Sequence, residues 1–221
     1  MGEGLNPGDQ FSYNLCFVDY LECTEFQIDW WVQGLEVISN EEKWVVQVVV
    51  YDGNTITTGK MHLGTVAPEP TGGDEELTVY RSAFKSSIVW LSAYATKDIG
   101  IAGKGPKAFT LPSWGKIANI GGEQILPTQV ETLFLPIGSV ETVRMQWKTG
   151  GSQSKVWIVD DFPFPVKAST WTHVSEGIPP QEYRFEILDY KQGVMENPFK
   201  DIVSTSGKNK ELGCPQNYDS C

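Results

Sequence analysis

The chain has 221 residues, of which 40% are hydrophobic and 20% are charged, so it is long enough and apolar enough to bury a sizeable core. Its formal net charge of -11 argues against nucleic-acid binding, because a phosphate backbone requires a basic surface. No apolar run approaches the roughly 18 residues of a membrane-spanning helix, so we expect no transmembrane segment in this sequence.

The first half of the chain reads as strands. Apolar and polar residues alternate over residues 10–15, and a second strand begins at Phe26. The apolar phase of this second strand changes after Gly34, which predicts a β-bulge there. Residues 44–51 form a nearly unbroken apolar run, and a turn sequence separates them from a hairpin partner over residues 55–63.

One long helix is predicted over residues 77–96, where apolar residues recur at spacings of three and four. Acidic residues just before it favour a helix N-terminus. Tyr80, Phe84, Ile88 and Leu91 belong to its apolar face, which is broad enough to lie across a sheet.

The second half predicts a continuous antiparallel meander. Its strands are expected over residues 130–135, 143–147, 156–159, 166–174 and 183–190. A meander with one apolar face forms a curved sheet whose inner face must be covered. The predicted fold is therefore α+β and mainly β, a curved antiparallel sheet or half-barrel wrapped around the one long amphipathic helix. We expect a single domain over residues 1–203 and a polar C-terminal tail over residues 204–221.

The four cysteines form two pairs of identical spacing, Cys16 with Cys23 and Cys214 with Cys221. No CxxC motif or flanking histidine accompanies them, which argues against a zinc or thiol redox site. Two short disulfide loops are the simplest connectivity, and they predict an extracytoplasmic protein, secreted or anchored at the cell surface. Four reduced thiols in a cytosolic protein are the alternative. We expect that a leader has been removed before Met1.

Candidate catalytic residues are few. His62 and His173 are the only histidines, and each is expected to face solvent from a strand. The carboxylates of Asp160 and Asp161 are neighbours along the chain, but successive residues of a strand point to opposite faces. Glu123 has no partner that the sequence identifies. We therefore expect no catalytic site, no metal site and no cofactor, and a hydrolase using Asp160 or Glu123 is the least favoured interpretation.

The tryptophans suggest a binding surface. Eight of them occur, and in a half-open barrel they either fill the core or line an apolar pocket. The candidate residues of a ligand groove are the helix residues Tyr80, Phe84, Ile88 and Leu91 on one wall and Trp30, Trp157 and Trp171 on the other.

Several motifs resemble a known family. These are Gly121-Gly122-Glu123-Gln124-Ile125, a strand ending in Thr132-Leu133-Phe134, Lys155-Val156-Trp157-Ile158-Val159 and Pro163-Phe164-Pro165-Val166-Lys167. Their order is similar to the sheet of secreted lipoprotein-carrier-like (LolA/LolB-like) domains. With the first strand, the chain resembles uncharacterised secreted archaeal proteins that carry such a sheet. The resemblance implies a curved sheet around a helix, with apolar ligands or lipoproteins held between them. Here, however, the helix follows four strands instead of opening the domain, and no family site residue can be transferred.

These observations predict an extracytoplasmic, non-enzymatic binding module for an apolar ligand, lipid-like or peptide. The alternative is a structural or cell-surface interaction domain whose interior is fully packed and whose partner is another cell-surface protein.

Overall fold

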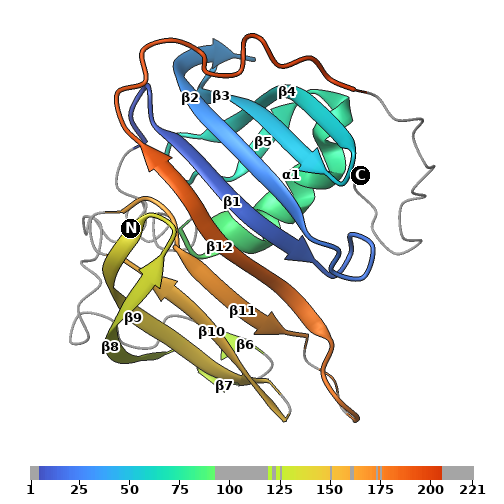
Figure 1. Cartoon of the computed structure of the whole chain (residues 1–221), viewed down its shortest axis with the longest axis vertical. Helices are drawn as coiled ribbons and strands as arrows, with labels where there is room; N and C mark the ends of the chain where they lie inside the picture. Colours follow the sequence, from blue (N-terminus) through green and yellow to red (C-terminus); the bar gives the residue numbers. More distant parts are fainter. Residues whose placement is uncertain are drawn as a thin grey trace.

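The computed structural model describes residues 5–92, 119–120, 123–124, 126–149, 151–159, 162–172, 174 and 176–205. Within these residues, ten strands form one open antiparallel sheet in the order β5-β4-β3-β2-β1-β12-β11-β10-β9-β8 (Figure 1). The strands are β1 (Gln10–Phe17), β2 (Phe26–Ile38), β3 (Glu41–Asp52), β4 (Thr55–Gly64), β5 (Pro70–Gly73), β8 (Leu126–Leu135), β9 (Gly138–Thr149), β10 (Ser152–Ile158), β11 (Lys167–Trp171) and β12 (Gln181–Lys191). The short strands β6 (Asn119–Ile120) and β7 (Glu123–Gln124) pair with each other.

The sheet consists of two meanders joined through β1. Each strand pairs with its sequence neighbour except at the junction, where β1 pairs with β12. The second meander curls so far that β8 contacts β12. The predicted mainly β architecture with a curved antiparallel sheet is therefore confirmed.

The predicted bulge is also confirmed. The register of β2 against β3 shifts between Val32 and Gly34, and Gly34 has a φ of +153°, which glycine adopts readily. Because the bulge adds one residue to β2, the residues after Gly34 alternate in the opposite phase to those before it. This shift matches the change in the apolar positions of the sequence.

The helix lies against the inner face of the sheet (Figure 1, green). It begins with the 3₁₀ turn η1 (Glu75–Leu77), continues as α1 (Thr78–Phe84) and the π-helical turn η2 (Lys85–Val89), and is helical to residue 92. The predicted residues 93–96 lie outside the described residues. Trp90 contacts the second meander, because its indole Nε1 donates to the Tyr183 hydroxyl and its ring lies 6.0 Å from that of Trp147. Among the described residues no helix is both long and apolar enough to cross a membrane.

The outer face of the first meander is covered by residues 192–205, which follow β12 and cross to β4. The sequence shows no periodicity here, yet Phe199 packs with Trp31 and Val49 in a second small core. The Trp31 indole Nε1 donates to the Val194 carbonyl at 2.8 Å. The first two residues of the predicted tail bond to β4, since the amide of Thr58 donates to Ser204 Oγ and that of Ile56 to Thr205 Oγ1, both at 2.9 Å. The rest of the tail lies outside the described residues.

The disulfide between Cys16 and Cys23 is present, as the spacing predicts. It closes the loop between β1 and β2, in which Leu21, Glu22 and Cys23 all have positive φ angles. The second predicted pair, Cys214 and Cys221, lies outside the described residues.

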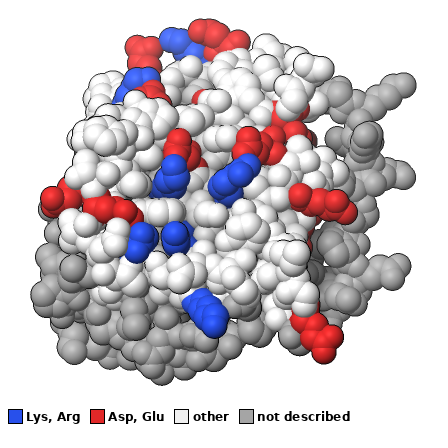
Figure 2. Space-filling view, turned by 60° about the horizontal axis from the view of Figure 1, so that its bottom comes forward, with Lys and Arg blue, Asp and Glu red and all other residues white. Residues whose placement is uncertain are grey.

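The charged side chains of the outer surface are largely mixed in sign. Lys167 pairs with Glu186 across β11 and β12, and Arg184 pairs with Glu25. Figure 2 shows basic and acidic side chains lying beside each other on the face that comes forward when the view of Figure 1 is tipped. The net charge of -11 therefore does not produce a surface of one sign on this face.

Asp29 is a buried acid on β2. Its carboxylate accepts hydrogen bonds from Ser12 Oγ at 2.5 Å and from Gln27 Nε2 at 2.9 Å. Burial raises the pKa of Asp29 above its usual 3.8, and the two hydrogen bonds lower it by a smaller amount. The charge of Asp189 also raises this pKa, whereas that of Lys191 lowers it. The folded state therefore holds this proton more tightly than the unfolded chain does.

Asp29→Asn is expected to stabilise the protein at pH 7 more than at pH 4. A raised folded-state pKa contributes stability that is complete below about 3.8 and is lost as the pH rises through the folded pKa. The asparagine variant does not lose stability in this way as the pH rises, because its side chain does not ionise. Its Oδ1 can also accept both hydrogen bonds. Urea unfolding at the two pH values measures the difference, with the exposed Asp201→Asn as the matched control. A larger gain at pH 4, or equal behaviour of both variants, would contradict the prediction.

Candidate functional site

Five of the seven groove candidates come together between the helix and the sheet. Trp30, Phe84, Ile88 and Leu91 are fully buried, and Tyr80 is 9% exposed. They belong to the main hydrophobic core, which runs through both meanders. In the described structure these five residues fill the inner face of the sheet.

Trp30 is the centre of this cluster. Its ring stacks on Phe11 and Tyr13, with centroids 5.2 and 5.1 Å away, and meets Phe84 and Phe164 edge-on at 4.9 and 5.7 Å. Among the described residues, the buried indole Nε1 has no hydrogen-bond acceptor. A buried donor without a partner destabilises the fold by about 1–3 kcal/mol.

Tyr80 attaches the start of the helix to the end of β3. Its hydroxyl donates to the Asp52 carboxylate at 3.1 Å, and the hydroxyl of Tyr20, from the disulfide loop, donates to the same oxygen. Burial raises the pKa of both phenols above 10.0, and the Asp52 carboxylate acts in the same direction. Both tyrosines therefore stay protonated and donate, which is a structural role.

The other two groove candidates lie elsewhere. Trp157 is half-buried on β10 opposite Arg144 and Lys167, and its Nε1 donates to Glu131 Oε1 at 2.5 Å. Trp171 is also half-buried, near the end of β11. The structure places these two tryptophans on β10 and β11, with Trp157 packed at the margin of the main core, and their membership of a ligand groove stays a prediction.

The inner face of the second meander carries hydroxyls that the sequence analysis missed. Thr149 and Ser154 are buried on either side of the β9–β10 turn, and their oxygens lie 2.9 Å apart. Ser154 Oγ also accepts the Trp171 amide at 3.0 Å. Because these donors and acceptors satisfy one another, we assign the pair to the packing of the sheet.

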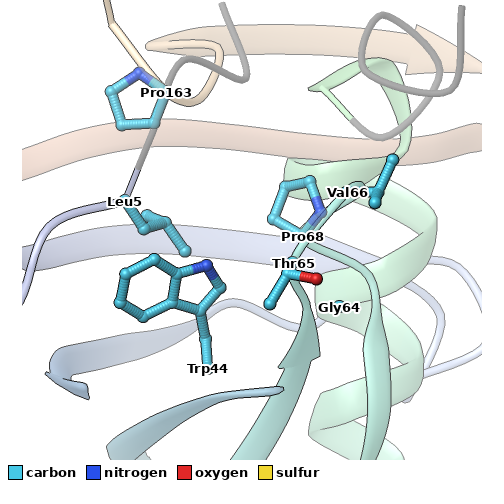
Figure 3. Close-up of a pocket in the computed structure, with 7 residues that line it drawn as sticks. All are labelled: Leu5, Trp44, Gly64, Thr65, Val66, Pro68 and Pro163. Atoms are coloured by element: carbon cyan, nitrogen blue, oxygen red, sulfur yellow. The ribbon is translucent and has the colours of Figure 1, made fainter. Parts of the chain in front are cut away.

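A small hollow opens at the end of the β3–β4 hairpin (Figure 3). Its volume is about 80 Å³, and we call it the Trp44 hollow. The residues that line it are Leu5, Trp44, Gly64, Thr65, Val66, Pro68 and Pro163. Figure 3 shows Leu5 above the indole of Trp44, with Thr65 and Pro68 to one side. Most of the lining side chains are apolar, while polar and apolar atoms share the lining surface about equally.

The loop after β4 shapes this hollow. The Gly64 amide donates to the Glu69 carbonyl at 3.0 Å, and the Glu69 amide donates to the Ala67 carbonyl at 2.8 Å. A Cβ on residue 64 would lie 2.5 Å from the Ala67 carbonyl oxygen, closer than any real contact. Only glycine therefore lets the loop fold back this tightly.

A second, shallower hollow of about 380 Å³ adjoins the same loop, and we call it the acidic shelf. It is lined by Glu41, Glu42, Lys43, Gly64, Thr65, Val66, Ala67 and Thr71. The Lys43 ammonium lies 3.4 Å from Glu41 Oε2. Both hollows share residues 64–66 as a wall.

The described residues include only some of the chemically reactive side chains that the sequence analysis singled out. No group of three or more His, Cys, Asp or Glu side chains suited to a metal occurs in this part of the chain. His62 lies on β4, half-buried. His173, Asp160 and Asp161 and the side chain of Glu123 lie outside what the structure describes, so their predicted roles remain untested.

No family model and no curated protein matches this chain. Two solved structures have weak overall similarity to it. One is a presumed exported protein with a YmcC-like fold from Bacteroides fragilis, 10% identical over 85% of this chain and 97% of that chain, with a TM-score of 0.37. The other is a presumed lipoprotein from Parabacteroides distasonis, 9% identical over 84% and 96% of the two chains, with a TM-score of 0.36. Neither is described as archaeal or as a lipoprotein carrier, and neither likeness assigns the chain to a family.

Proposed function

We propose that this protein is an extracytoplasmic, non-enzymatic binding module that seats one apolar group of its ligand in the Trp44 hollow. The Cys16–Cys23 disulfide supports the location, because such bonds persist in oxidising compartments. The hollow itself is the observation that carries the binding function. Its floor is Trp44 on β3, next to the end of β4, so it is supported by paired strands.

The size of the hollow limits what it accepts. An apolar cavity of about 150 Å³ holds a benzene ring, so a volume of about 80 Å³ suits a branched aliphatic group and excludes a full lipid chain. This proposal keeps the apolar ligand expected from the sequence, but it places the ligand on the surface of a packed domain.

A second candidate is an apolar ligand held between the helix and the sheet, as in the lipoprotein-carrier-like domains that the sequence resembles. The indole Nε1 of Trp30, which has no acceptor among the described residues, favours it, because an inserted ligand with an acceptor atom could satisfy that donor. The helix would have to move away from the sheet to admit it, since side chains fill this space.

Titration with N-acetyl-leucinamide tests the first candidate. Burying a leucine-sized group contributes about 1.5–3 kcal/mol, so we expect a dissociation constant in the millimolar range or weaker. The readout is the Trp44 indole N–H resonance in ¹H–¹⁵N NMR spectra, assigned with Trp44→Phe. A saturable shift of this resonance is the expected result.

Gly64→Ala should weaken this binding at least tenfold, because its Cβ would collide with the Ala67 carbonyl and displace the loop. Gly151→Ala is the matched control, since a Cβ at residue 151 meets nothing within 4 Å. An absent shift, or equal binding by both variants, would overturn the proposal. Co-purified lipid in native mass spectrometry would instead support the second candidate.

A further inference from the structure

The loop after β4 adjoins two hollows whose lining side chains differ, since Leu5, Trp44 and Pro68 line one and Glu41, Glu42 and Lys43 line the other. Residues 64–66 form a wall of both the Trp44 hollow and the acidic shelf. A ligand that crosses this loop would therefore meet an apolar cavity on one side and carboxylates on the other. A polypeptide can present both an apolar group and a cationic group on neighbouring residues.

The charge of the shelf is unbalanced. Glu41 is paired with Lys43, whereas Glu42 has no ion pair among the described residues. Two carboxylates and one ammonium leave one net negative charge, and the chain as a whole has a net charge of -11. The shelf therefore complements a basic side chain, and the whole protein attracts cationic partners at low ionic strength.

The loop also offers main-chain partners. Within the part of the chain that the structure describes, the peptide groups of Thr65 and Val66 make no backbone hydrogen bond. Both residues are exposed, and the side chain of Val66 is directed away from Trp44 in Figure 3. An extended peptide laid across the loop can pair with these groups, as peptides do at exposed strand edges.

Resting on the proposed function, we infer that the ligand is an extended polypeptide segment in which a branched aliphatic side chain has a Lys or Arg close to it in sequence. The aliphatic side chain enters the Trp44 hollow, and the basic side chain lies over Glu42. The backbone between them runs across Thr65 and Val66. This assignment distinguishes the partner from a lipid, which carries no such alternation of side chains and backbone amides.

Three peptides test this inference: acetyl-Gly-Lys-Leu-Lys-Gly-amide, the same peptide with both lysines replaced by glutamate, and the same peptide with leucine replaced by serine. Binding to the whole protein is followed by the Trp44 indole N–H resonance at low salt. We expect the affinity of the lysine–leucine peptide to be at least about tenfold higher than that of either other peptide. Its affinity should fall in 0.5 M salt, a concentration chosen to give a Debye length of about 4 Å.

Glu42→Gln is expected to reduce the affinity for the lysine–leucine peptide by about two- to fivefold, the range of an exposed ion pair, without changing that for N-acetyl-leucinamide. Glu176→Gln, an exposed residue on the β11–β12 connection, is the matched control and should change neither affinity. If N-acetyl-leucinamide binds but the lysine and glutamate peptides bind equally, this inference is overturned and the proposed function stands. If neither probe shifts the Trp44 resonance, both are overturned.

Discussion

Trp30→Ala is expected to lower the free energy of unfolding by about 3–5 kcal/mol, the largest effect of any single substitution considered for this chain. Trp30 is fully buried and touches four aromatic rings, so its removal leaves a large cavity between the helix and the sheet. Urea unfolding followed by circular dichroism gives the free energy. A loss below about 1 kcal/mol would show that the helix does not depend on this contact.

Trp30→Phe separates the packing of the ring from its polar atom. The indole Nε1 of Trp30 makes no hydrogen bond to the residues that the structure describes, so phenylalanine removes an unsatisfied donor while it keeps most of the apolar contact. Its cost should be no more than about 1 kcal/mol. Trp31→Phe is the matched control on the opposite face, where the indole donates to the Val194 carbonyl, and it should cost more than Trp30→Phe. A larger loss of stability from Trp30→Phe than from Trp31→Phe would contradict the prediction.

Replacing Cys16 and Cys23 together with alanine is expected to lower the free energy of unfolding by about 2–3 kcal/mol. The bond closes a short loop, with a sequence separation of 7, and thereby restricts the unfolded chain. The same loop holds Leu21, Glu22 and Cys23 at positive φ, which non-glycine residues adopt at a cost of about 1–2 kcal/mol each. The disulfide also keeps Tyr20 in place beside Asp52 and Tyr80.

Urea unfolding of the wild type and of the double alanine variant, each with and without a reductant, measures this contribution. The wild type in reductant should approach the stability of the variant. Any further loss that the reductant causes in the variant reports on Cys214 and Cys221, which the substitution leaves intact. Equal stabilities of wild type and variant without reductant would contradict the prediction.

Local sequence patterns predicted the elements well, because each depends on residues that are close along the chain. Alternation located the strands, the phase change after Gly34 located the bulge, and the spacing of Cys16 and Cys23 predicted their bond. The helix was placed from its three-and-four spacing, although the π-helical turn η2 within it was not expected. Secondary structure of this kind follows from periodicity and steric preference.

The position of residues 192–205 could not be predicted from local sequence patterns. This segment is mostly polar and aperiodic, and the sequence analysis predicts no strand or helix there. The structure instead seats Phe199 on Trp31 and Val49, because the neighbouring strands β2 and β3 present an apolar outer face that a side chain from much later in the chain can cover. Contacts of this kind depend on which strands become neighbours, and no local pattern contains that information.

By itself, the sequence determined the antiparallel strands, the helix that begins near residue 77 and one disulfide loop, since these follow from the spacing of apolar residues and cysteines. The tertiary structure alone decided the pairing of β1 with β12 and the position of the Trp44 hollow. That hollow brings together Leu5, Trp44, Pro163 and the loop after β4, which lie far apart along the chain. Their meeting depends on the curvature and order of the whole sheet, which arise from the packing of all its strands at once.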